Sequence, residues 1–343
     1  MKKKLSDLSG NMLALATGIL FAIFIVICLE IFLLLFNRYQ DRTKTITWNT
    51  PGTHMQKDRL FGYKYKPGSL AYSTKKVNGS IKDKITYTID KYGRRGTTVE
   101  PPQGRNNYIG FLGCSVVFGL HVNDNETLPY YAGVYSPAYS PYNYGVGGYG
   151  PQQMLIRLKE TAIRDEIKQR RGIFIYVFID AHIARAAGSM KIISHWGKGM
   201  PCYIIDNNGK LIRKGDFRTV RPVRTFIYDI IGKSNIARSF KLDWPPGYPE
   251  QDILLTYRII EDSYEAYKKD FGNDEFYVLI FPGSKFGKRL IPYLKRCGIK
   301  YLDYSGIDFR GKEFKVEGDT HPCPKAYRIL AEKLTKDLGI SDK

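Results

Sequence analysis

Ile173-Phe-Ile-Tyr-Val-Phe-Ile179 and Phe276-Tyr-Val-Leu-Ile-Phe281 are two apolar runs without any polar alternation. Such runs are typical of strands that are buried on both faces, as in a parallel sheet. A shorter apolar strand, Tyr108-Ile-Gly-Phe-Leu112, precedes them. Amphipathic helices are predicted after the strands, at 252–270, 285–297 and 324–338. This alternation predicts an α/β fold in which helices cover both faces of a parallel sheet.

The turn after the first of these strands reads Phe111-Leu-Gly-Cys-Ser-Val-Val-Phe-Gly119. Because ligand sites of open α/β sheets lie at the carboxyl ends of the strands, this turn would present Ser115 at such a site. The stretch Gly318-Asp-Thr-His-Pro322 precedes the last helix and places Asp319 and His321 on one loop. Serine, histidine and aspartate are the three members of a nucleophilic triad.

A glycine-dense loop, Asn143-Tyr-Gly-Val-Gly-Gly-Tyr-Gly-Pro151, lies between these two motifs and exposes backbone N–H groups that could bind an anion. In this order, Gly-x-Ser, the glycine loop and Asp-x-His-Pro resemble the SGNH/GDSL hydrolase superfamily, over residues 107–338. The segment His121-Val-Asn-Asp-Asn-Glu-Thr-Leu-Pro129 also resembles the one that follows the nucleophile in bacterial envelope-associated members. The resemblance implies a three-layer, flavodoxin-like domain.

The resemblance also implies roles for individual residues. Ser115 would attack an ester carbonyl, His321 would be the base, and Asp319 would orient the histidine. The backbone N–H of Gly148 would help to bind the oxyanion, with Gly145 as the alternative register.

The sequence departs from the family pattern in two places. Cys114 stands where the family usually has the aspartate of Gly-Asp-Ser, and this aspartate is not the triad acid. The strand that ends at Ile179 continues as Asp180-Ala-His-Ile-Ala-Arg185, without the asparagine that the family supplies there as an oxyanion donor. Either His182 or Arg185 takes its place, or the oxyanion hole is weaker.

Residues 12–36 form an apolar run of 25 residues, which as a helix is about 37 Å long and exceeds a hydrocarbon core of about 30 Å. The run is too long for a secretory signal and no A-x-A site follows it, so we expect an uncleaved transmembrane anchor behind a short tail, 1–11. The partner of the anchor is the lipid bilayer. Glu30 is expected to snorkel to the membrane surface, or else to pair with another helix.

The charges on the two sides of the run are nearly balanced, so they do not settle the topology. The three lysines at 2–4 are compact and the leading tail is short. We therefore expect a single-pass membrane protein with its amino terminus in the cytoplasm and its bulk outside.

The rest of the chain divides into two parts. Residues 37–105 are predicted to be a tether, irregular over 37–58, followed by a small β-rich extension. Residues 106–343 form the hydrolase-like domain. Within it, 189–250 interrupt the alternation of strands and helices, and their Asn-Asn-Gly at 207–209 predicts a hairpin. We expect an insertion at the rim of the sheet.

The chain has 343 residues, and 53 Lys+Arg against 33 Asp+Glu give it a net charge of +20. For an anchored protein, this charge favours anionic lipids or an anionic envelope polysaccharide as partners. Nucleic acid is not expected, because no recognised nucleic-acid motif is present. The five cysteines contain no CxxC pair and the five histidines no HxxxH pair, so neither a metal nor a cofactor is predicted.

Together these features predict a membrane-anchored serine esterase or O-acyl(acetyl)transferase that acts on an ester of a cell-envelope glycan. A second hypothesis is a catalytically degenerate SGNH-like scaffold that binds anionic or acylated glycan within a membrane assembly. A third, an unrelated basic α/β anchor protein, requires that Ser115 and His321 lie far apart.

Overall fold

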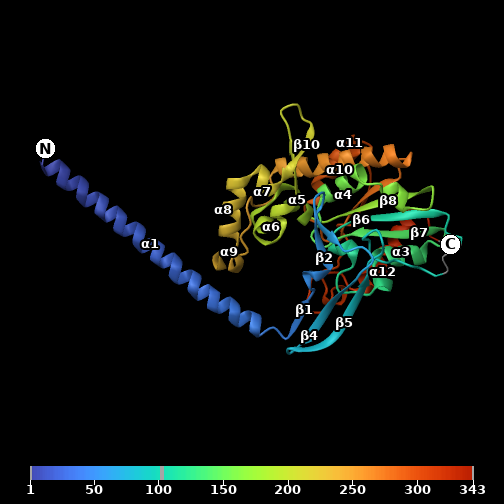
Figure 1. The fold of residues 1–343 in the computed structure, drawn as a ribbon, viewed down its shortest axis with the longest axis horizontal. Coiled ribbons are helices and arrows are strands. Elements are labelled where there is room, and N and C mark those ends of the chain that lie inside the picture. Colours follow the sequence, from blue (N-terminus) through green and yellow to red (C-terminus); the bar gives the residue numbers. More distant parts are fainter. Residues whose placement is uncertain (1, 101–103, 342–343) are drawn as a thin grey trace.

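The computed structural model describes residues 2–100 and 104–341, and a five-stranded sheet forms its centre (Figure 1). The strand order is β12-β11-β8-β6-β7, and every neighbouring pair is parallel. The bounds are β6 Asn107–Gly113, β7 Tyr139–Gly145, β8 Arg171–Phe178, β11 Phe276–Ile280 and β12 Lys300–Asp303. The predicted α/β fold with a parallel central sheet is confirmed.

The side chains of β8 alternate between two apolar cores, one on each face of the sheet. Phe174, Tyr176 and Phe178 face one core. That core is covered by α4 (Pro151–Glu160), α10 (Glu250–Phe271) and α11 (Ile291–Arg296). Ile173, Ile175 and Val177 face the other, which is covered by α3 (Leu128–Tyr135) and α12 (Pro324–Asp337). The domain therefore has three layers, and β8 is buried on both sides.

Two of the predicted helices match α10 and α12 closely, but the one predicted over 285–297 is shorter. Its first part is a 3-10 turn, η5 (Gly287–Arg289), and α11 begins only at Ile291. The carboxylate of Asp180 accepts hydrogen bonds from the backbone N–H of Lys285 at 2.7 Å and of Phe286 at 3.1 Å. This contact from the end of β8 holds the preceding loop in a non-helical form.

The predicted irregular tether over 37–58 is wrong in large part. Helix α1 (Lys2–Arg42) continues past the apolar run, and β1 (Ile46–Asn49) and β2 (Met55–Asp58) follow it, with η1 (Gly52–His54) between them. The extension is completed by β3 (Gly62–Tyr65), β4 (Leu70–Val77) and β5 (Ser80–Thr88). Strand β1 forms because it pairs with β4, and β2 because it pairs with β3. Residues 101–103, at the end of the predicted extension, lie outside the described residues.

Residues 189–250 add no strand to the five-stranded sheet. After α5 (Ala181–Ala187), they form helices and an antiparallel hairpin whose turn contains the predicted Asn-Asn-Gly. Their elements are α6 Met190–His195, η4 Gly197–Gly199, β9 Pro201–Ile205, β10 Leu211–Asp216, α7 Phe217–Val220, α8 Pro222–Gly232 and α9 Asn235–Ser239. The remaining short elements are α2 Ser115–Phe118, η2 Asp124–Glu126, η3 Ile163–Glu166 and η6 Lys312–Phe314.

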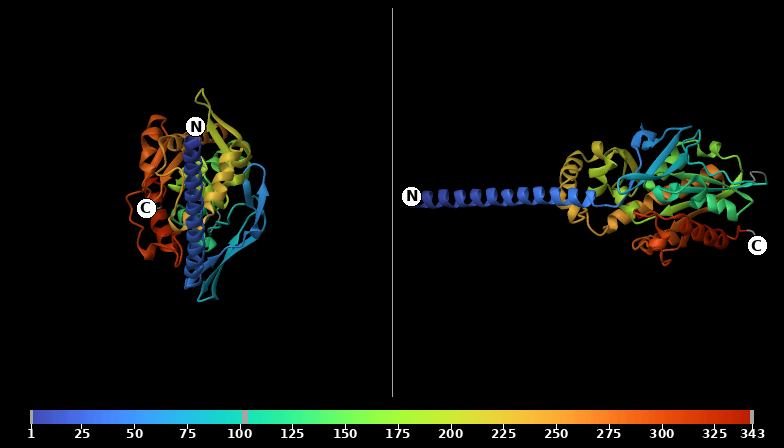
Figure 2. Two further views of the ribbon diagram at one scale, coloured as in Figure 1. Left: turned by 90° about the vertical axis from the view of Figure 1, so that its left-hand side faces the viewer. Right: turned by 90° about the horizontal axis from the view of Figure 1, so that it is seen from below.

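Helix α1 projects from the domain as a single rod (Figure 2). Among the described residues it is the one helix that is long and apolar enough to cross a membrane, judged by length and composition. Of the two expectations for Glu30, the structure shows the contact with another helix. The Glu30 carboxylate accepts hydrogen bonds from the backbone N–H groups of Asn235 and Ile236, so it caps α9.

Candidate active site

Ser115 begins α2, directly after β6, at the carboxyl edge of the sheet. Its side chain is buried but reaches an open cleft of about 780 Å³. The turn is tight because a Cβ on Gly113 would lie only 2.6 Å from Val117. Gly113, two residues before the serine, therefore lets α2 pack closely on the end of β6.

His321 approaches Ser115 from the loop that precedes α12. Its Nε2 lies 2.8 Å from Ser115 Oγ, and its Nδ1 contacts the carboxylate of Asp319. The backbone N–H of His321 donates to the same carboxylate at 2.7 Å. The structure thus brings together the three residues that the sequence motifs single out, from two ends of the domain, in one hydrogen-bonded chain.

The charge of Asp319 fixes the direction of this chain. Burial alone would raise the pKa of Asp319, but the hydrogen bonds and charge of His321, with a smaller effect of His121, lower it to about 2. An ionised carboxylate only accepts hydrogen bonds, so Nδ1 of His321 carries the proton. Its Nε2 is then free to accept the hydroxyl proton of Ser115, which is the arrangement that a general base needs.

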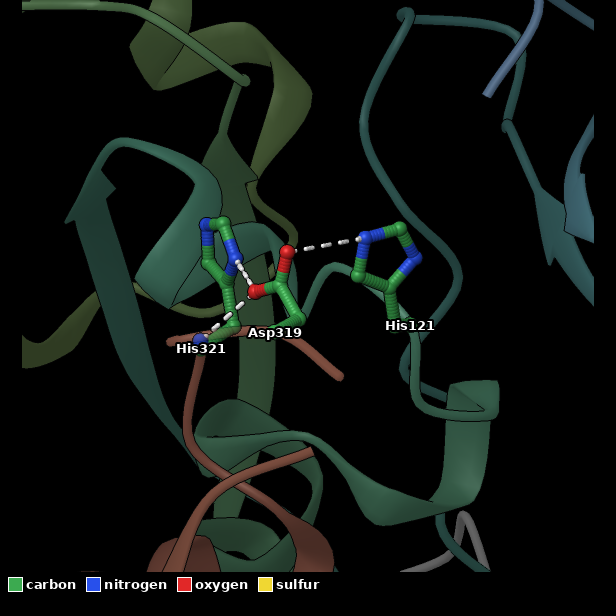
Figure 3. A group of neighbouring side chains, drawn as sticks. All are labelled: His121, Asp319 and His321. Carbon is green, nitrogen blue, oxygen red and sulfur yellow. Dashed lines mark hydrogen bonds and ion pairs between the residues drawn. The ribbon is translucent and has the colours of Figure 1, made fainter. Parts of the chain in front are cut away.

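A second histidine lies on the other side of Asp319 (Figure 3). Nε2 of His121 is 3.7 Å from Asp319 Oδ2, too far for a hydrogen bond but close enough for electrostatic contact. Burial lowers the pKa of His121 to about 4, and the nearby His321 adds to this, whereas Asp319 opposes it. His121 is therefore neutral at pH 7.

The β-rich extension holds His121 in place. Its Nδ1 lies 3.1 Å from Ser73 Oγ, and Ser73 lies 2.6 Å from the hydroxyl of Tyr87. The Tyr87 hydroxyl accepts a hydrogen bond from the His121 backbone N–H at 3.0 Å. Trp48 stacks on the imidazole with the ring centroids 4.3 Å apart. Three strands, β1, β4 and β5, thus fix one ring beside the carboxylate.

Gly148 lies in the cleft, where its φ of +80° is a conformation that favours glycine. A Cβ at this position would lie 2.4 Å from the hydroxyl of Tyr63. That hydroxyl donates to the carbonyl of Gly147 at 2.8 Å. Because a trans peptide is planar, fixing the Gly147 carbonyl also fixes the Gly148 N–H, which points away from Tyr63.

Two of the predicted oxyanion-binding residues are not available in this structure. The N–H of Gly145 donates to Asn143 Oδ1 at 2.9 Å, and the residue packs against the backbone of α2. His182 is fully buried and its Nδ1 lies 2.7 Å from the hydroxyl of Tyr176, on the other side of β8 from the core beside Ser115. The reason is that residues 181–187 form a helix, which turns this side chain into the core.

Arg185, the alternative to His182, does line the cleft. Its guanidinium donates to the carbonyl of Tyr149 at 2.7 Å, so it also supports the end of the glycine loop. The cleft is otherwise mostly apolar, and its apolar lining includes Met55, Val116, Leu120, Ile179, Phe281 and Trp196.

Sequence reasoning missed Arg95, which organises the loop after Ser115. This side chain is fully buried and donates hydrogen bonds to the carbonyls of Phe118 at 2.6 Å and of Val122 at 2.6 Å, and to the carboxylate of Asp124 at 2.9 Å. The loop between these residues carries His121. Nothing in the sequence indicates that Arg95 is buried, because a buried arginine cannot be distinguished from an exposed one by sequence alone.

His121, Asp319 and His321 have possible ligand atoms within 4.8 Å of one another, close enough to hold a cation. However, both ring nitrogens of His321 already contact protein groups, so this arrangement suits proton transfer better than metal binding. The five cysteines are all unpaired, and Cys114 is buried in the core beneath Ser115.

No family profile matches the sequence, and no curated protein matches it. Among solved structures, the chain is similar to a member of the lipolytic G-D-S-L family from Veillonella parvula, with 13% identity, a TM-score of 0.39, and coverage of 68% of this chain and 97% of that one. It is also similar to an acetyl xylan esterase from the rumen bacterium Butyrivibrio proteoclasticus, with 11% identity, a TM-score of 0.40, and coverage of 78% and 69%. The first protein is of the group that the sequence motifs resemble.

Proposed function

We propose that this chain is a membrane-anchored serine ester hydrolase whose catalytic residues are Ser115, His321 and Asp319. The observation that carries the proposal is the hydrogen-bonded chain from Ser115 Oγ through His321 to Asp319, at the floor of an open cleft. A serine becomes nucleophilic when an adjacent base takes its proton and a third group orients the base.

In the proposed reaction, Oγ of Ser115 attacks the ester carbonyl while Nε2 of His321 accepts the hydroxyl proton. The charge of Asp319 stabilises the imidazolium that forms, and His321 then gives its proton to the leaving alcohol. Water, or a sugar hydroxyl in a transferase, attacks the acyl-enzyme through the same base and releases the acyl group. The proton returns from His321 to Ser115.

The backbone N–H groups of Ser115 and Gly148 are the proposed donors to the developing oxyanion. Tyr63 supports this role for Gly148 because it fixes the orientation of the Gly147–Gly148 peptide group. Arg185, on α5, is the polar side chain from the segment after β8 that lines the cleft, and we propose it as the third donor.

The substrate is proposed to be an O-acyl ester, such as an acetyl ester, on an anionic glycan of the cell envelope. The apolar lining of the cleft suits an acyl group, and the net charge of +20 attracts an anionic polymer. The apolar helix α1 anchors the chain in a membrane, with the cleft outside the cytoplasm.

The proposal is tested with a fluorophosphonate, which reacts with an activated serine. The full-length chain in detergent is treated with the probe, and any adduct is located by peptide mass spectrometry. We expect labelling at Ser115 that disappears in His321→Ala, and Ser115→Ala should lower kcat on a small acetyl ester by at least about 1000-fold. An unlabelled Ser115 together with full esterase activity in Ser115→Ala would overturn the proposal.

A second candidate is a scaffold that binds acylated or anionic glycan without turnover. It is favoured by the burial of His182 away from the cleft, which leaves no histidine or asparagine at the end of β8 to complete the oxyanion hole. Loss of one oxyanion donor costs about 100- to 1000-fold in rate. Polymer binding without any labelling of Ser115 would favour the scaffold.

A further inference from the structure

Helix α8 carries an apolar stripe that faces away from the protein. Its exposed apolar side chains are Val223, Phe226, Ile227, Ile230 and Ile231. Spacings of three and four residues put them on one face of the helix, while the other face packs on α6. After α9, the side chains of Phe240, Leu242 and Trp244 are exposed as well. These eight residues are called the α8–α9 patch below, and such a patch marks a contact surface.

The patch adjoins the apolar helix α1, because α9 packs directly against it. The backbone and side-chain N–H groups of Asn235 donate to Glu30 at 2.8 and 3.0 Å. One turn further along α1, Leu33 is buried, and the amide of Asn37 donates to Ser239 at 3.1 Å. Figures 1 and 2 both show α8 and α9 on the side of the domain from which α1 projects.

The length of α1 sets the depth of these contacts in a bilayer. About 20 helical residues cross a hydrocarbon core of about 30 Å, so a crossing that starts at Met12 ends near Ile31. The contacts with α9 run from Glu30 to Asp41. They therefore lie where α1 leaves the hydrocarbon and passes through the head-group layer, whichever side of the membrane that is.

The apolar residues of α1 that lie beyond this crossing also need an apolar environment, as the α8–α9 patch does. Phe32 and Leu35 lie beyond the end of this crossing and are 62% and 60% exposed. They are on the same stretch of α1 as the contacts with α9, the helix that connects the apolar stripe of α8 to Phe240, Leu242 and Trp244. A single apolar surface that continues from a membrane span is covered most simply by the same membrane.

The charges around the patch indicate the kind of lipid. Between residues 221 and 244 the basic residues are Arg221, Arg224, Lys233, Arg238 and Lys241. Two of these basic residues are paired: Lys233 with Asp229 at 2.8 Å, and Arg238 with Asp41 of α1 at 2.5 Å. Asp229 also pairs with Lys198 at 2.6 Å, and Asp243 accepts from Ser189 at 2.9 Å. Arg221, Arg224 and Lys241 therefore supply the basic charge of this stretch that is not paired with a carboxylate in the described structure. Apolar side chains flanked by basic ones are typical of a segment that lies in the interface of an anionic membrane.

We propose that the α8–α9 patch is a second membrane contact, lying in the head-group layer of a bilayer that contains anionic lipid. This inference rests on the proposed membrane span of α1. Only residues 43–45 separate α1 from β1, so the two contacts together hold the domain in one orientation. Helix α6, which packs on α8, is followed by Trp196 in the lining of the cleft. The patch thus sets the position of the cleft relative to the membrane surface.

Trp244 makes the contact measurable, because it belongs to the patch and is 57% exposed. The full-length chain is placed, one copy per disc, in nanodiscs whose lipids carry bromine near the head group. The emission of the wild type minus that of Trp244→Phe gives the contribution of Trp244. We expect the brominated lipid to remove about half or more of this contribution, as for an indole at the membrane interface. Phosphatidylglycerol should increase the quenching relative to phosphatidylcholine, and high salt should reverse that increase.

Two sets of substitutions complete the test. Phe226→Ser combined with Ile230→Ser removes exposed apolar side chains, and we expect it to restore most of the Trp244 emission. Val134→Ser changes an exposed apolar residue on α3, remote from α1, and should leave the quenching as in the wild type. Equal loss of quenching in both variants would contradict a specific contact.

The outcomes separate the patch from the anchor and from catalysis. If the protein resists alkaline extraction from membranes but the Trp244 contribution is the same in brominated and plain discs, the patch proposal is overturned and the anchor stands. A second copy or another protein as the occupant would give this result in single-copy discs. If the chain is extracted by alkali, the proposed span itself fails. Fluorophosphonate labelling of Ser115 tests the catalytic proposal independently.

Discussion

At the scale of single residues, Gly148 is the most sensitive point of the proposed oxyanion hole. Its φ of +80° and the 2.4 Å approach of a Cβ to Tyr63 mean that Gly148→Ala must shift the loop. We expect kcat for a small acetyl ester to fall by about 100- to 1000-fold, the usual effect of losing one oxyanion donor. A Cβ on the neighbouring Gly147 meets nothing within 4 Å, so Gly147→Ala is the matched control. Similar losses in the two variants would argue against Gly148 as the donor.

His121 makes a prediction about stability and pH. Its pKa is about 6.5 in an unfolded chain and about 4 in the folded protein. Between these pH values His121 takes up a proton in the unfolded state only. Its contribution to the free energy of unfolding is therefore fully present above pH 6.5 and is lost as the pH falls towards 4. His121→Gln cannot titrate, and its amide can still contact Ser73.

We therefore expect the free energy of unfolding of the wild type to fall with decreasing pH more steeply than that of His121→Gln, by up to about 1.4 kcal/mol per pH unit within this window. Urea unfolding in detergent at several pH values measures the difference. Parallel curves between pH 6.5 and 4 would show that His121 titrates normally in the folded protein.

At the scale of elements, the β-rich extension is part of the candidate site. Strand β3 supplies Tyr63, which holds the Gly147 carbonyl, while β4 and β5 supply the hydroxyls beside His121. Tyr63→Phe removes one hydrogen bond without changing the ring. We expect kcat to fall by about 5-fold, because a hydrogen bond of about 1 kcal/mol no longer orients the Gly148 N–H, and KM to change little.

Tyr72→Phe is the matched control, since Tyr72 lies on β4 and its ring contacts are with His54 and Lys84. Steady-state kinetics on one acetyl ester distinguish the two variants. A change of KM alone in Tyr63→Phe would mean that Tyr63 touches the substrate rather than the glycine loop.

Elements can be predicted from the sequence where their burial produces a recognisable run of apolar residues. Residues 173–178 of β8 form an apolar run because both faces of the strand are covered there. Ser115 is found from the turn motif after β6, and His321 from the loop motif before α12. The sequence does not reveal β1, because this strand exists through its pairing with residues 74–77 on β4. His182 fails as a candidate for a related reason: whether its ring faces the cleft or the core depends on a helix that starts at Ala181.

At the scale of the whole molecule, we predict that removing α1 disturbs α9 and leaves the α8–α9 patch without a membrane to cover it. A fragment that starts at residue 45 loses the carboxylate of Glu30 that caps α9, and it uncovers the face of α9 that packs on α1. The cleft and the central sheet lie apart from this region, so the fragment should still react with a fluorophosphonate at Ser115.

The exposed patch should nonetheless make this fragment associate. Without detergent we expect oligomers of the wild-type fragment in light scattering after gel filtration, and monomers once Phe226 and Ile230 are both replaced by serine, because the apolar stripe that joins the copies is interrupted. The corresponding fragment with Val134→Ser should behave like the wild type. A wild-type fragment that stays monomeric in plain buffer would show that the patch needs no cover, and the orientation of the cleft would then depend on α1 alone.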